Sequence, residues 1–459
     1  MVDITTLETS SLGDRSYLVS DGTVAAVVDP QRDIDRVLDA ARRLGVRITH
    51  VFETHVHNDY VTGGFQLARE TGAAYHLHAD DEVQFDRVGL RDGDSVDVGT
   101  LRFTALHTPG HTPTHLSYVV HSGGRDVAVF TGGSLLYGTV GRTDLISRAM
   151  AEELSRLQHR SARRLADLLD DDVSVMPTHG FGSFCSSTPA GEGTDASTIG
   201  RERSDNLALT VGDEDAFVER LLSGLDAYPR YYAHMAPRNR LGPEPVDLTP
   251  PVPADPTELC QRIHAGEWVV DLRTRTLFAA DHLRGTVNIE VGDTFTTYLG
   301  WLVPWNRPLT LVGDTPDEVA EAQRQLVRIG IDRPAAAATG GVEVYGAGGD
   351  RGKYEVADFA ELARAHERGE RPVVLDVRRE DERAQGGIPD ALHIPVHDLE
   401  RRVDEVPTGE VWVHCASGYR SAVAASLLAR AGRTPVLIDD EYERAVELGL
   451  TGETAGARS

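Results

Sequence analysis

The feature that most constrains the fold of this chain is a series of histidines that each follow an apolar, strand-like run. The first lie in THVHNDYVTGG (54–64), at the end of the run ITHVFETH (48–55). The next lie in HTPGHTPTH (107–115), and the last closes VSVMPTHG (173–180). A single HxH pair could equally serve as surface or capping residues. Imidazoles at successive strand ends on one side of a sheet can share one ion, so the pattern predicts a metal site.

Composition limits the classes of protein to which the chain can belong. At 459 residues it is too long for one core and is expected to form about three domains. The 72 acidic and 46 basic residues give a formal charge of −26, which opposes binding to nucleic acid or to an anionic membrane. We find no apolar run that could span a bilayer and no signal-peptide pattern, so we expect a cytoplasmic protein.

Cysteine usage points to a reactive thiol rather than to disulfides. The three cysteines, Cys185, Cys260 and Cys415, are too few and too scattered for a disulfide framework. In a cytoplasmic protein, a cysteine in a special local context is better interpreted as a nucleophile. Cys260 has apolar neighbours at helical spacing and is expected in the core.

The first half of the chain alternates strand-like and helix-like segments. Apolar residues recur at helical spacing over 33–46 and 149–171, whereas 23–30, 48–55 and 173–180 favour strands. The proline-rich segment 243–256 predicts a linker, and the glycine-rich segment 346–354 predicts a second, flexible break.

The segments after these two breaks resemble each other. WVVDLRTR (268–275) matches PVVLDVRRE (372–380), which aligns Asp271 with Asp376 and Arg273 with Arg378. Further along, 309–330 parallels 411–432. We therefore predict an internal repeat of two α/β units.

The histidine motifs resemble those of the metallo-β-lactamase fold over roughly residues 1 to 245. The motifs are THVHND, HTPGHT, FTGGSLLYGTVGRTDL and PTHG, and they are most similar to the persulfide dioxygenase and glyoxalase II branch. The resemblance implies an N-terminal αββα sandwich. It also implies a metal site whose candidate ligands are His55, His57, Asp59, His111 and His179.

Two positions depart from the pattern of that family. In the dioxygenases the iron is held by residues that match His55, His111 and Gly133, but glycine offers no ligand. Tyr60 stands where many such loops have another histidine, so a second ion would keep only Asp59 and His179. We expect one ion on His55, His57 and His111 with open coordination positions.

The identity of that ion stays open at this stage. One Fe(II) per chain is expected and Zn(II) is the alternative. Asp59 could turn inward to rebuild a two-histidine, one-carboxylate set, or the domain could be a scaffold with a dead metal site.

Three further residues of this domain have two interpretations each. The resemblance places Arg142, in GRTDL, near a carboxylate-bearing thiol substrate, but it could equally pair with Asp144. Tyr60 could bind oxygen or substrate, or could simply be a packing residue. Cys185 could lie near the metal pocket or be a small buried thiol.

The second half contains a candidate sulfur carrier. CASGYRSA (415–422) follows the strand-like run VWVH and precedes a helix, so backbone N–H groups around Gly418 converge on Cys415. The positive helix end and Arg420 favour the thiolate, and the same cradle could hold a persulfide anion.

This segment resembles a rhodanese domain, which we place at 355–459. The resemblance implies that Cys415 accepts sulfur and that Arg420 and Ser421 complete the active loop. Gly387 and the segment DDEYERA (439–445) depart from the family's pattern. In the earlier repeat, placed at 255–345, Gly313 and Glu318 occupy the positions of the cysteine and the arginine, so that domain resembles an inactive rhodanese. The resulting fold class is α/β: a metallo-β-lactamase sandwich followed by two rhodanese-like domains with parallel sheets.

Both resemblances together imply sulfur chemistry. The leading hypothesis is a persulfide dioxygenase and sulfurtransferase that acts on glutathione or other low-molecular-weight persulfides in sulfide detoxification. The alternatives are a mononuclear zinc thioester hydrolase in the manner of glyoxalase II, and a sulfur-relay protein with a degenerate metal domain. Expected partners are small-molecule thiols and persulfides, with no nucleic acid and no membrane, and a homo-oligomer is left open.

Overall fold

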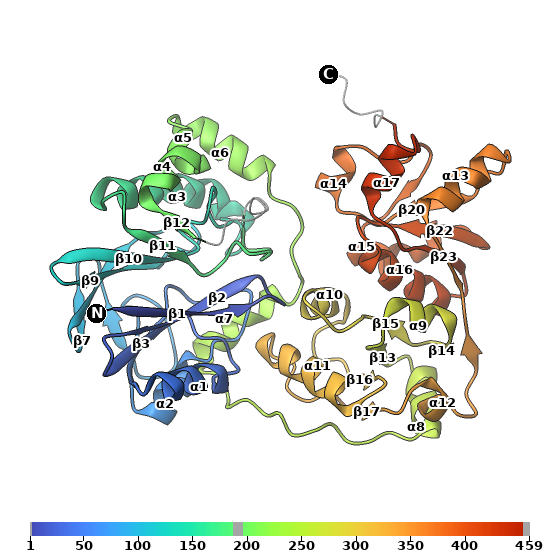
Figure 1. The fold of residues 1–459 in the computed structure, drawn as a ribbon, viewed down its shortest axis with the longest axis horizontal. Helices are drawn as coiled ribbons and strands as arrows, with labels where there is room; N and C mark the ends of the chain where they lie inside the picture. The colour runs from blue at the N-terminus through green and yellow to red at the C-terminus, as the bar shows by residue number, and fades with distance from the viewer. Residues whose placement is uncertain (1, 187–195, 453–459) are drawn as a thin grey trace. The chain divides into compact units, whose positions relative to one another are not determined.

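The computed structural model describes residues 2–186 and 196–452. The chain forms two compact units, Met1–Asp247 with Leu326–Ile331, and Leu248–Gln325 with Asp332–Ser459 (Figure 1). Within the described residues, we find no helix that is both long and apolar enough to cross a membrane.

The first unit is built on two six-stranded sheets. The first sheet has the strands in chain order: β1 (Asp3–Thr9), β2 (Asp14–Ser20), β3 (Val24–Val28), β4 (Arg47–Phe52), β5 (Ala74–His78) and β6 (Val88–Leu90). The second sheet runs from β7 to β12: β7 (Ser95–Val98), β8 (Leu101–His107), β9 (Leu116–Ser122), β10 (Arg125–Gly132), β11 (Ser174–Pro177) and β12 (Ser197–Thr198).

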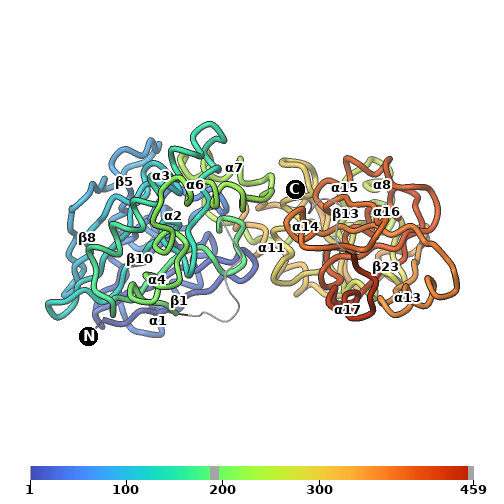
Figure 2. The backbone as a smooth tube through the Cα atoms, turned by 90° about the horizontal axis from the view of Figure 1, so that it is seen from above, coloured from blue at the N-terminus to red at the C-terminus, as the bar shows by residue number. Residues whose placement is uncertain are grey.

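Helices cover the outer face of each sheet. The first sheet carries α1 (Asp35–Leu44), α2 (Gly64–Thr71) and α7 (Tyr232–Leu241). The second carries α3 (Ala151–Leu168), α4 (Ile199–Asp205), α5 (Leu207–Thr210) and α6 (Glu214–Ser223), preceded by the 3-10 turn η1 (Arg148–Met150). Figure 2 shows this unit from above, with α3 and α4 over the sheet that contains β10. The layers are therefore α, β, β and α.

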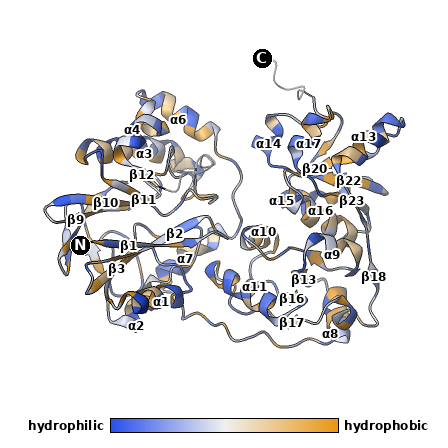
Figure 3. Ribbon diagram, viewed as in Figure 1, coloured by the Kyte–Doolittle hydropathy of each residue, from blue (hydrophilic) through white to orange (hydrophobic). Residues whose placement is uncertain are grey.

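Alternating side chains explain why the two sheets pack face to face. On β2, Tyr17 and Val19 enter the core between the sheets, whereas Leu18 faces the helices. Successive residues of a strand point to opposite faces, so strands buried on both faces must be apolar throughout. Helix α3 instead has hydrophobic and hydrophilic residues on different sides, as expected for a helix on the surface of a sheet (Figure 3).

The second unit contains two parallel sheets in which four equivalent strands have the same order, and the later sheet has a fifth strand at its edge. One is made of β15 (Val287–Asn288), β13 (Trp268–Asp271), β16 (Leu309–Val312) and β17 (Ala336–Ala338). The other is made of β21 (Leu392–His393), β20 (Val373–Asp376), β22 (Glu410–His414), β23 (Thr434–Ile438) and β19 (Glu355–Ala357). Both place the repeated Asp at the end of a central strand, β13 or β20.

The remaining elements of this unit connect and flank the two sheets. The helices of the earlier part are α8 (Pro256–His264), α9 (Arg275–Ala280), α10 (Phe295–Leu302), α11 (Pro316–Arg328) and α12 (Val342–Tyr345). Those of the later part are α13 (Phe359–Glu367), α14 (Glu380–Ala384), α15 (Val396–Arg402), α16 (Tyr419–Arg430) and α17 (Tyr442–Glu447), with the 3-10 turn η2 (Val403–Glu405). A short ladder joins β14 (His282–Leu283) to β18 (Arg351–Gly352).

Most predicted elements are confirmed, with shorter ends. The helices expected over 33–46 and 149–171 are α1 and α3, and the strand expected over 48–55 is β4. The glycine-rich segment 346–354 differs from the prediction, because it includes β18. Glycine permits this close approach, since a Cβ at Gly352 would lie 2.8 Å from Nε2 of His282.

Candidate metal centre and sulfur-carrier loop

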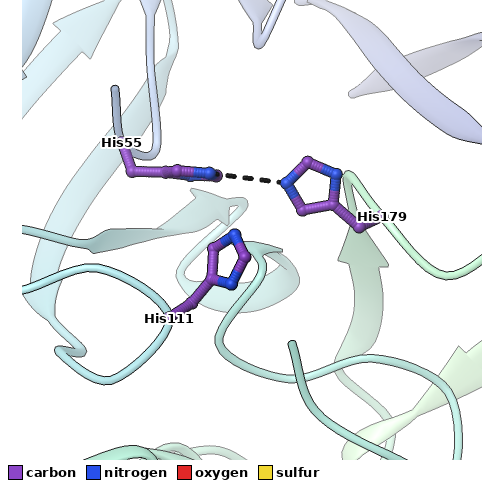
Figure 4. Close-up of side chains that lie close together, drawn as sticks. All are labelled: His55, His111 and His179. Atoms are coloured by element: carbon purple, nitrogen blue, oxygen red, sulfur yellow. Dashed lines mark hydrogen bonds between the residues drawn. The ribbon is translucent and has the colours of Figure 1, made fainter. Parts of the chain in front are cut away.

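Three buried histidines from separate segments converge at one end of the sheets of the first unit. His55 follows β4, His111 follows β8, and His179 follows β11 (Figure 4). One nitrogen of each ring lies within 4.8 Å of the others. Nε2 of His55 is 3.4 Å from Nε2 of His179.

The second nitrogen of each ring has an anchoring partner outside the centre. Nδ1 of His111 donates to the carbonyl oxygen of Arg142 (2.8 Å), and Nδ1 of His179 lies 2.9 Å from Asp14. Nδ1 of His55 is 2.9 Å from the hydroxyl of Thr54. Such contacts fix the tautomer and the orientation of a metal-binding imidazole.

A second group of possible ligands overlaps the first at His179. His57, Asp59 and His179 also present atoms within 4.8 Å of one another. The sequence predicted His55, His57 and His111 as one set; in the structure His55 and His111 group with His179, and His57 belongs to the second group. The ring of His57 still lies 4.1 Å from that of His55, and its Nε2 is 2.9 Å from the Tyr60 hydroxyl.

Two acids hold His57 from behind. Its Nε2 is 3.2 Å from both Glu53 Oε2 and Asp29 Oδ1. Burial alone would lower the pKa of His57, but the Asp29 and Glu53 carboxylates outweigh burial and raise it to about 9. These acids therefore stabilise positive charge at His57, whether it comes from a proton or from an ion bound at the other nitrogen.

The donor set fits a metal ion. Among the described residues, three buried atoms that border the centre have no partner: Nδ1 of His57, Nε2 of His111 and Oδ1 of Asp59, whose other oxygen lies 3.2 Å from Nδ1 of His179. Buried polar atoms without partners are costly and rare, and a cation would satisfy all three. Neutral imidazole and carboxylate are ligands for both iron and zinc.

The space beside Gly133 is filled by a neighbouring side chain. A Cβ at Gly133 would lie only 2.3 Å from Cδ2 of His111, so this ring fills the space that a side chain would need. The peptide N–H of Gly133 donates to Nε2 of His115 (3.1 Å), a buried histidine that the sequence did not single out. The turn is thus built around two imidazoles in place of a carboxylate.

The other residues considered for this site have structural partners. Arg142 is 3% exposed, pairs with both oxygens of Asp144 (2.7 and 2.9 Å) and also donates to the carbonyl oxygen of Asp226. Of its two interpretations, the ion pair with Asp144 is the one observed. Tyr60 is buried and packs its ring on that of His57 (centroids 4.2 Å apart), and its hydroxyl also bonds Nε2 of His57.

The structure places two further titratable residues, Asp14 and Cys185, near the centre. Asp14, the first residue of β2, was not predicted, and nothing in its local sequence marks it. Burial and the neighbouring Asp59 raise its pKa to about 7, while His179 opposes this shift. The buried thiol of Cys185 also interacts with Asp59, and burial raises its pKa well above the ordinary value. Cys185 is therefore a neutral thiol beside the centre.

In the second unit, Cys415 lies in the loop between β22 and α16. Its side chain is only 2% exposed, and Sγ is 3.6 Å from the hydroxyl of Ser421. Gly418 has a φ of 90°, which favours glycine, and no side chain caps the helix that begins at Tyr419. The N-terminus of α16 therefore has no side-chain cap, an arrangement that suits an anion.

The guanidinium of Arg420 is paired with a carboxylate. It forms a two-pronged pair with Glu382 of α14, with Nη2 2.7 Å from Oε1. Glu382 was not predicted from the sequence. The start of α16 has no side-chain cap, and the Asp439 carboxylate lies close to Gly418.

The strand-end pairs of the repeat have the same geometry in both copies. Arg273 Nη2 lies 2.7 Å from Asp271, and Arg378 Nη2 lies 2.7 Å from Asp376. The loops differ, however: at the position that matches Cys415, Gly313 is followed by a loop whose N–H groups bond Glu318.

Comparisons with known proteins agree with these two sites. The metallo-beta-lactamase superfamily model matches residues 14–179, and the rhodanese-like domain model matches residues 358–444. A probable metallo-hydrolase of Burkholderia pseudomallei is 30% identical over 214 residues, which are 40% of this chain and 68% of that protein. The mitochondrial persulfide dioxygenase ETHE1 of Homo sapiens is 27% identical over 214 residues, 44% of this chain and 73% of that protein.

A solved structure extends the likeness beyond the first unit. The crystal structure of a metallo-beta-lactamase from Staphylococcus aureus has a TM-score of 0.66 and 26% identity, and covers 74% of this chain and 99% of that chain. The predicted fold class is confirmed: an N-terminal metallo-beta-lactamase fold precedes a rhodanese-like domain with a parallel sheet. The chain therefore belongs to the metallo-beta-lactamase superfamily and carries a rhodanese-like domain in its C-terminal part.

Proposed function

We propose that this protein is a persulfide dioxygenase and rhodanese-type sulfurtransferase that acts on glutathione persulfide or another low-molecular-weight persulfide. The observation that carries the proposal is the pairing, in one chain, of a buried imidazole centre with unpartnered donor atoms and a cysteine in a helix-end cradle. The likeness to a persulfide dioxygenase supports the first half, and the rhodanese-like match supports the second.

In the first unit, His55, His111 and His179 would hold one ion. Iron bound there would supply O2 chemistry, whereas zinc would supply hydrolysis. Asp14 orients His179, the carbonyl of Arg142 orients His111, and Glu53 with Tyr60 orients His57. Because these histidines are all buried, the surrounding core excludes bulk water from the persulfide sulfur.

In the second unit, Cys415 would accept the sulfane sulfur. Its thiolate attacks the outer sulfur of the donor, a new S–S bond forms at Cys415, and the S–S bond of the donor breaks. The donor leaves as a thiolate or as sulfite, so electrons and charge balance. The N–H groups at the start of α16 stabilise the negative charge on the cysteine persulfide.

One observation favours a second candidate function, a zinc thioester hydrolase. The group of His57, Asp59 and His179 is a ligand set for an ion beside the first. The probable metallo-hydrolase among the relatives is consistent with this alternative.

Elemental analysis of anaerobically purified protein, joined to an oxygen-electrode assay with glutathione persulfide, separates the two. Iron at about one equivalent with persulfide-dependent O2 consumption is the expected outcome. Zinc with cleavage of a glutathione thioester, and no O2 consumption, would replace the dioxygenase proposal with the hydrolase.

The sulfur-transfer half is tested by Cys415→Ser. Because the thiolate is the nucleophile, we expect thiosulfate:cyanide sulfur transfer to fall to background. Cys260→Ser is the matched control and should keep full activity, since Cys260 packs in an apolar cluster of α8. Retained transfer in the Cys415→Ser protein would refute the assigned role.

A further inference from the structure

Residues 326–331, which we call the clamp segment, include the end of α11 and belong to the first unit, although the rest of that helix belongs to the second. Arg328 anchors this segment. Its side chain is only 7% exposed, Nη2 lies 2.7 Å from Oδ2 of Asp33, and Nη1 donates to the hydroxyl of Ser11 (3.0 Å). Breaking a buried ion pair is costly, because it leaves a charge without its partner, so the clamp segment is held firmly in the first unit.

The clamp segment contacts the metal-binding loop of residues 54–64, which carries three of the five candidate ligands. The peptide N–H of Val61 donates to the carbonyl oxygen of Arg328 (2.7 Å). Val61 directly follows Tyr60, whose hydroxyl bonds Nε2 of His57 (2.9 Å). The carbonyl of Arg328 therefore fixes the backbone beside a residue that orients a candidate ligand.

Helix α7 holds the same loop and is itself bonded to the clamp segment. The buried Asn239 donates to the carbonyl oxygens of His57 (3.0 Å) and Tyr60 (2.9 Å). Arg238, the residue before it, donates to the carbonyl oxygen of Gly330 (2.7 Å). The clamp segment thus supports the loop twice, once directly and once through α7.

We propose that the clamp segment positions the metal-binding loop, and that Arg328 is the positioning residue on which the affinity of the centre for its ion depends. Contacts behind metal ligands hold them in place, and losing such contacts lowers affinity even where every ligand remains. Nδ1 of His57 and Oδ1 of Asp59 have no partner among the described residues, so their places depend on the loop that carries them. The inference rests on the metal centre proposed above, whichever of the two reactions that centre performs.

This role would give the repeat without a cysteine a function of its own. The clamp segment continues α11, the helix of that repeat which is equivalent to α16. In the alignment of 309–330 with 411–432, Arg328 matches Arg430. The guanidinium of Arg430 lies over the ring of Trp268, 5.0 Å from its centroid, so the two repeats use this position for different contacts.

The test uses the full chain, freed of metal and titrated with Co(II), whose visible absorption reports the bound ion. Arg328→Met keeps the length of the side chain but loses the bonds to Asp33 and Ser11. We expect its affinity for Co(II), measured by competition with a chelator, to fall at least about tenfold. Hydrogen exchange should show a loss of protection at the amide of Val61. Arg328→Lys, which can keep the ion pair with Asp33, should lie between the wild type and Arg328→Met in both readouts.

Arg163→Met is the matched control, because Arg163 on α3 donates to the carbonyl oxygens of Leu209 (3.2 Å) and Val211 (2.9 Å), outside the metal-binding loop. It should lower the melting temperature, as Arg328→Met does, but keep wild-type Co(II) affinity and protection at Val61. Wild-type affinity in both Arg328 variants, or an equal loss in Arg163→Met and Arg328→Met, would overturn this inference alone. Failure of the wild-type chain to bind Co(II) would instead overturn the metal centre on which the inference rests.

Discussion

Contacts behind the histidines decide which nitrogen each ring turns toward the candidate metal centre. His179 is the clearest case: Asp14 binds its Nδ1, and Nε2 is left to face His55. The motifs THVHND, HTPGHT and PTHG located the residues of the centre, because each motif ends a strand. They did not reveal Asp14, which lies far away in sequence and reaches the centre only through strand pairing.

Glu53 could have been found from the sequence. It stands directly before the THVHND motif, at the end of β4, where a carboxylate inside an apolar run is unusual. The grouping of the ligands could not be found in this way. It depends on the turn of the His57 ring toward Glu53 and Tyr60, which no spacing rule predicts.

A different histidine makes the first unit sensitive to acid. His76 on β5 is 3% exposed and stacks on Phe52 at 4.5 Å, and neither ring nitrogen has a partner among the described residues. Burial lowers its pKa from 6.5 to about 4. Above pH 6.5 the His76 ring is neutral in both the folded and the unfolded state, so it adds no pH dependence to the stability. As the pH falls from 6.5 toward 4, only the unfolded state gains the proton, and the folded state loses stability.

We expect His76→Phe to remove this part of the acid sensitivity. At pH 5 the wild type should lose about 2 kcal/mol of unfolding free energy at this position, relative to pH 7. The variant should lose correspondingly less, measured by urea unfolding at both pH values with circular dichroism. His121→Phe, at a partly exposed histidine on β9, is the control. An equal pH dependence in wild type and His76→Phe would contradict the assignment.

At the scale of elements, two equivalent loops differ in whether the N-terminus of the following helix is capped by a side chain. Before α16 the helix begins at Gly418 without a side-chain cap. Before α11, Thr315 accepts from the N–H of Glu318, and the Glu318 carboxylate accepts from Asp314 (2.7 Å) and Thr315 (3.3 Å). This reciprocal capping box occupies the N–H groups that would bind an anion. We therefore propose that the cap, as well as the missing cysteine, leaves the earlier repeat unable to carry sulfur.

This difference in helix capping could have been predicted from the sequence. The letters TPDE (315–318) match the pattern of a capping box, whereas SGYR (417–420) does not. Strands and helices of both repeats were predictable for the same reason, because short apolar runs and helical periodicity are local properties. Contacts such as that between Glu382 and Arg420 were not, because they join separate elements.

Removing the cap should destabilise the earlier part of the second unit. For Glu318→Ala we expect a loss of about 1 kcal/mol in unfolding free energy, since two loop N–H groups lose their acceptor. Tryptophan fluorescence reports on this unit, because all four tryptophans lie after residue 247. Glu321→Ala, which removes only a contact to Gln325 on the same helix, should cost less. Equal losses in the two variants would argue against the capping box.

At the scale of the whole molecule, each site is built from residues of one unit. The histidine centre uses residues between Asp14 and His179, and the Cys415 site uses residues between Glu382 and Ser421. No ligand of one site takes part in the other. Fold class was predictable at this scale because each domain carries its own motifs, and the unit boundary at Asp247 lies within the proline-rich segment 243–256, whereas no motif indicates that Leu326–Ile331 groups with the first unit.

The last prediction follows from this separation of the two sites. His111→Ala removes a ring nitrogen that has no other partner, so bound metal should fall below about one tenth of the wild-type level. Thiosulfate:cyanide sulfur transfer should stay unchanged in this variant, while Cys415→Ser should lose transfer and keep its metal. The double variant should show both losses without further effect, because the two sites share no residues or partners. His121→Ala serves as the control for histidine removal in the first unit. Unchanged metal content in His111→Ala would remove His111 from the ligand set, and a loss of sulfur transfer in that variant would show that the two sites are coupled.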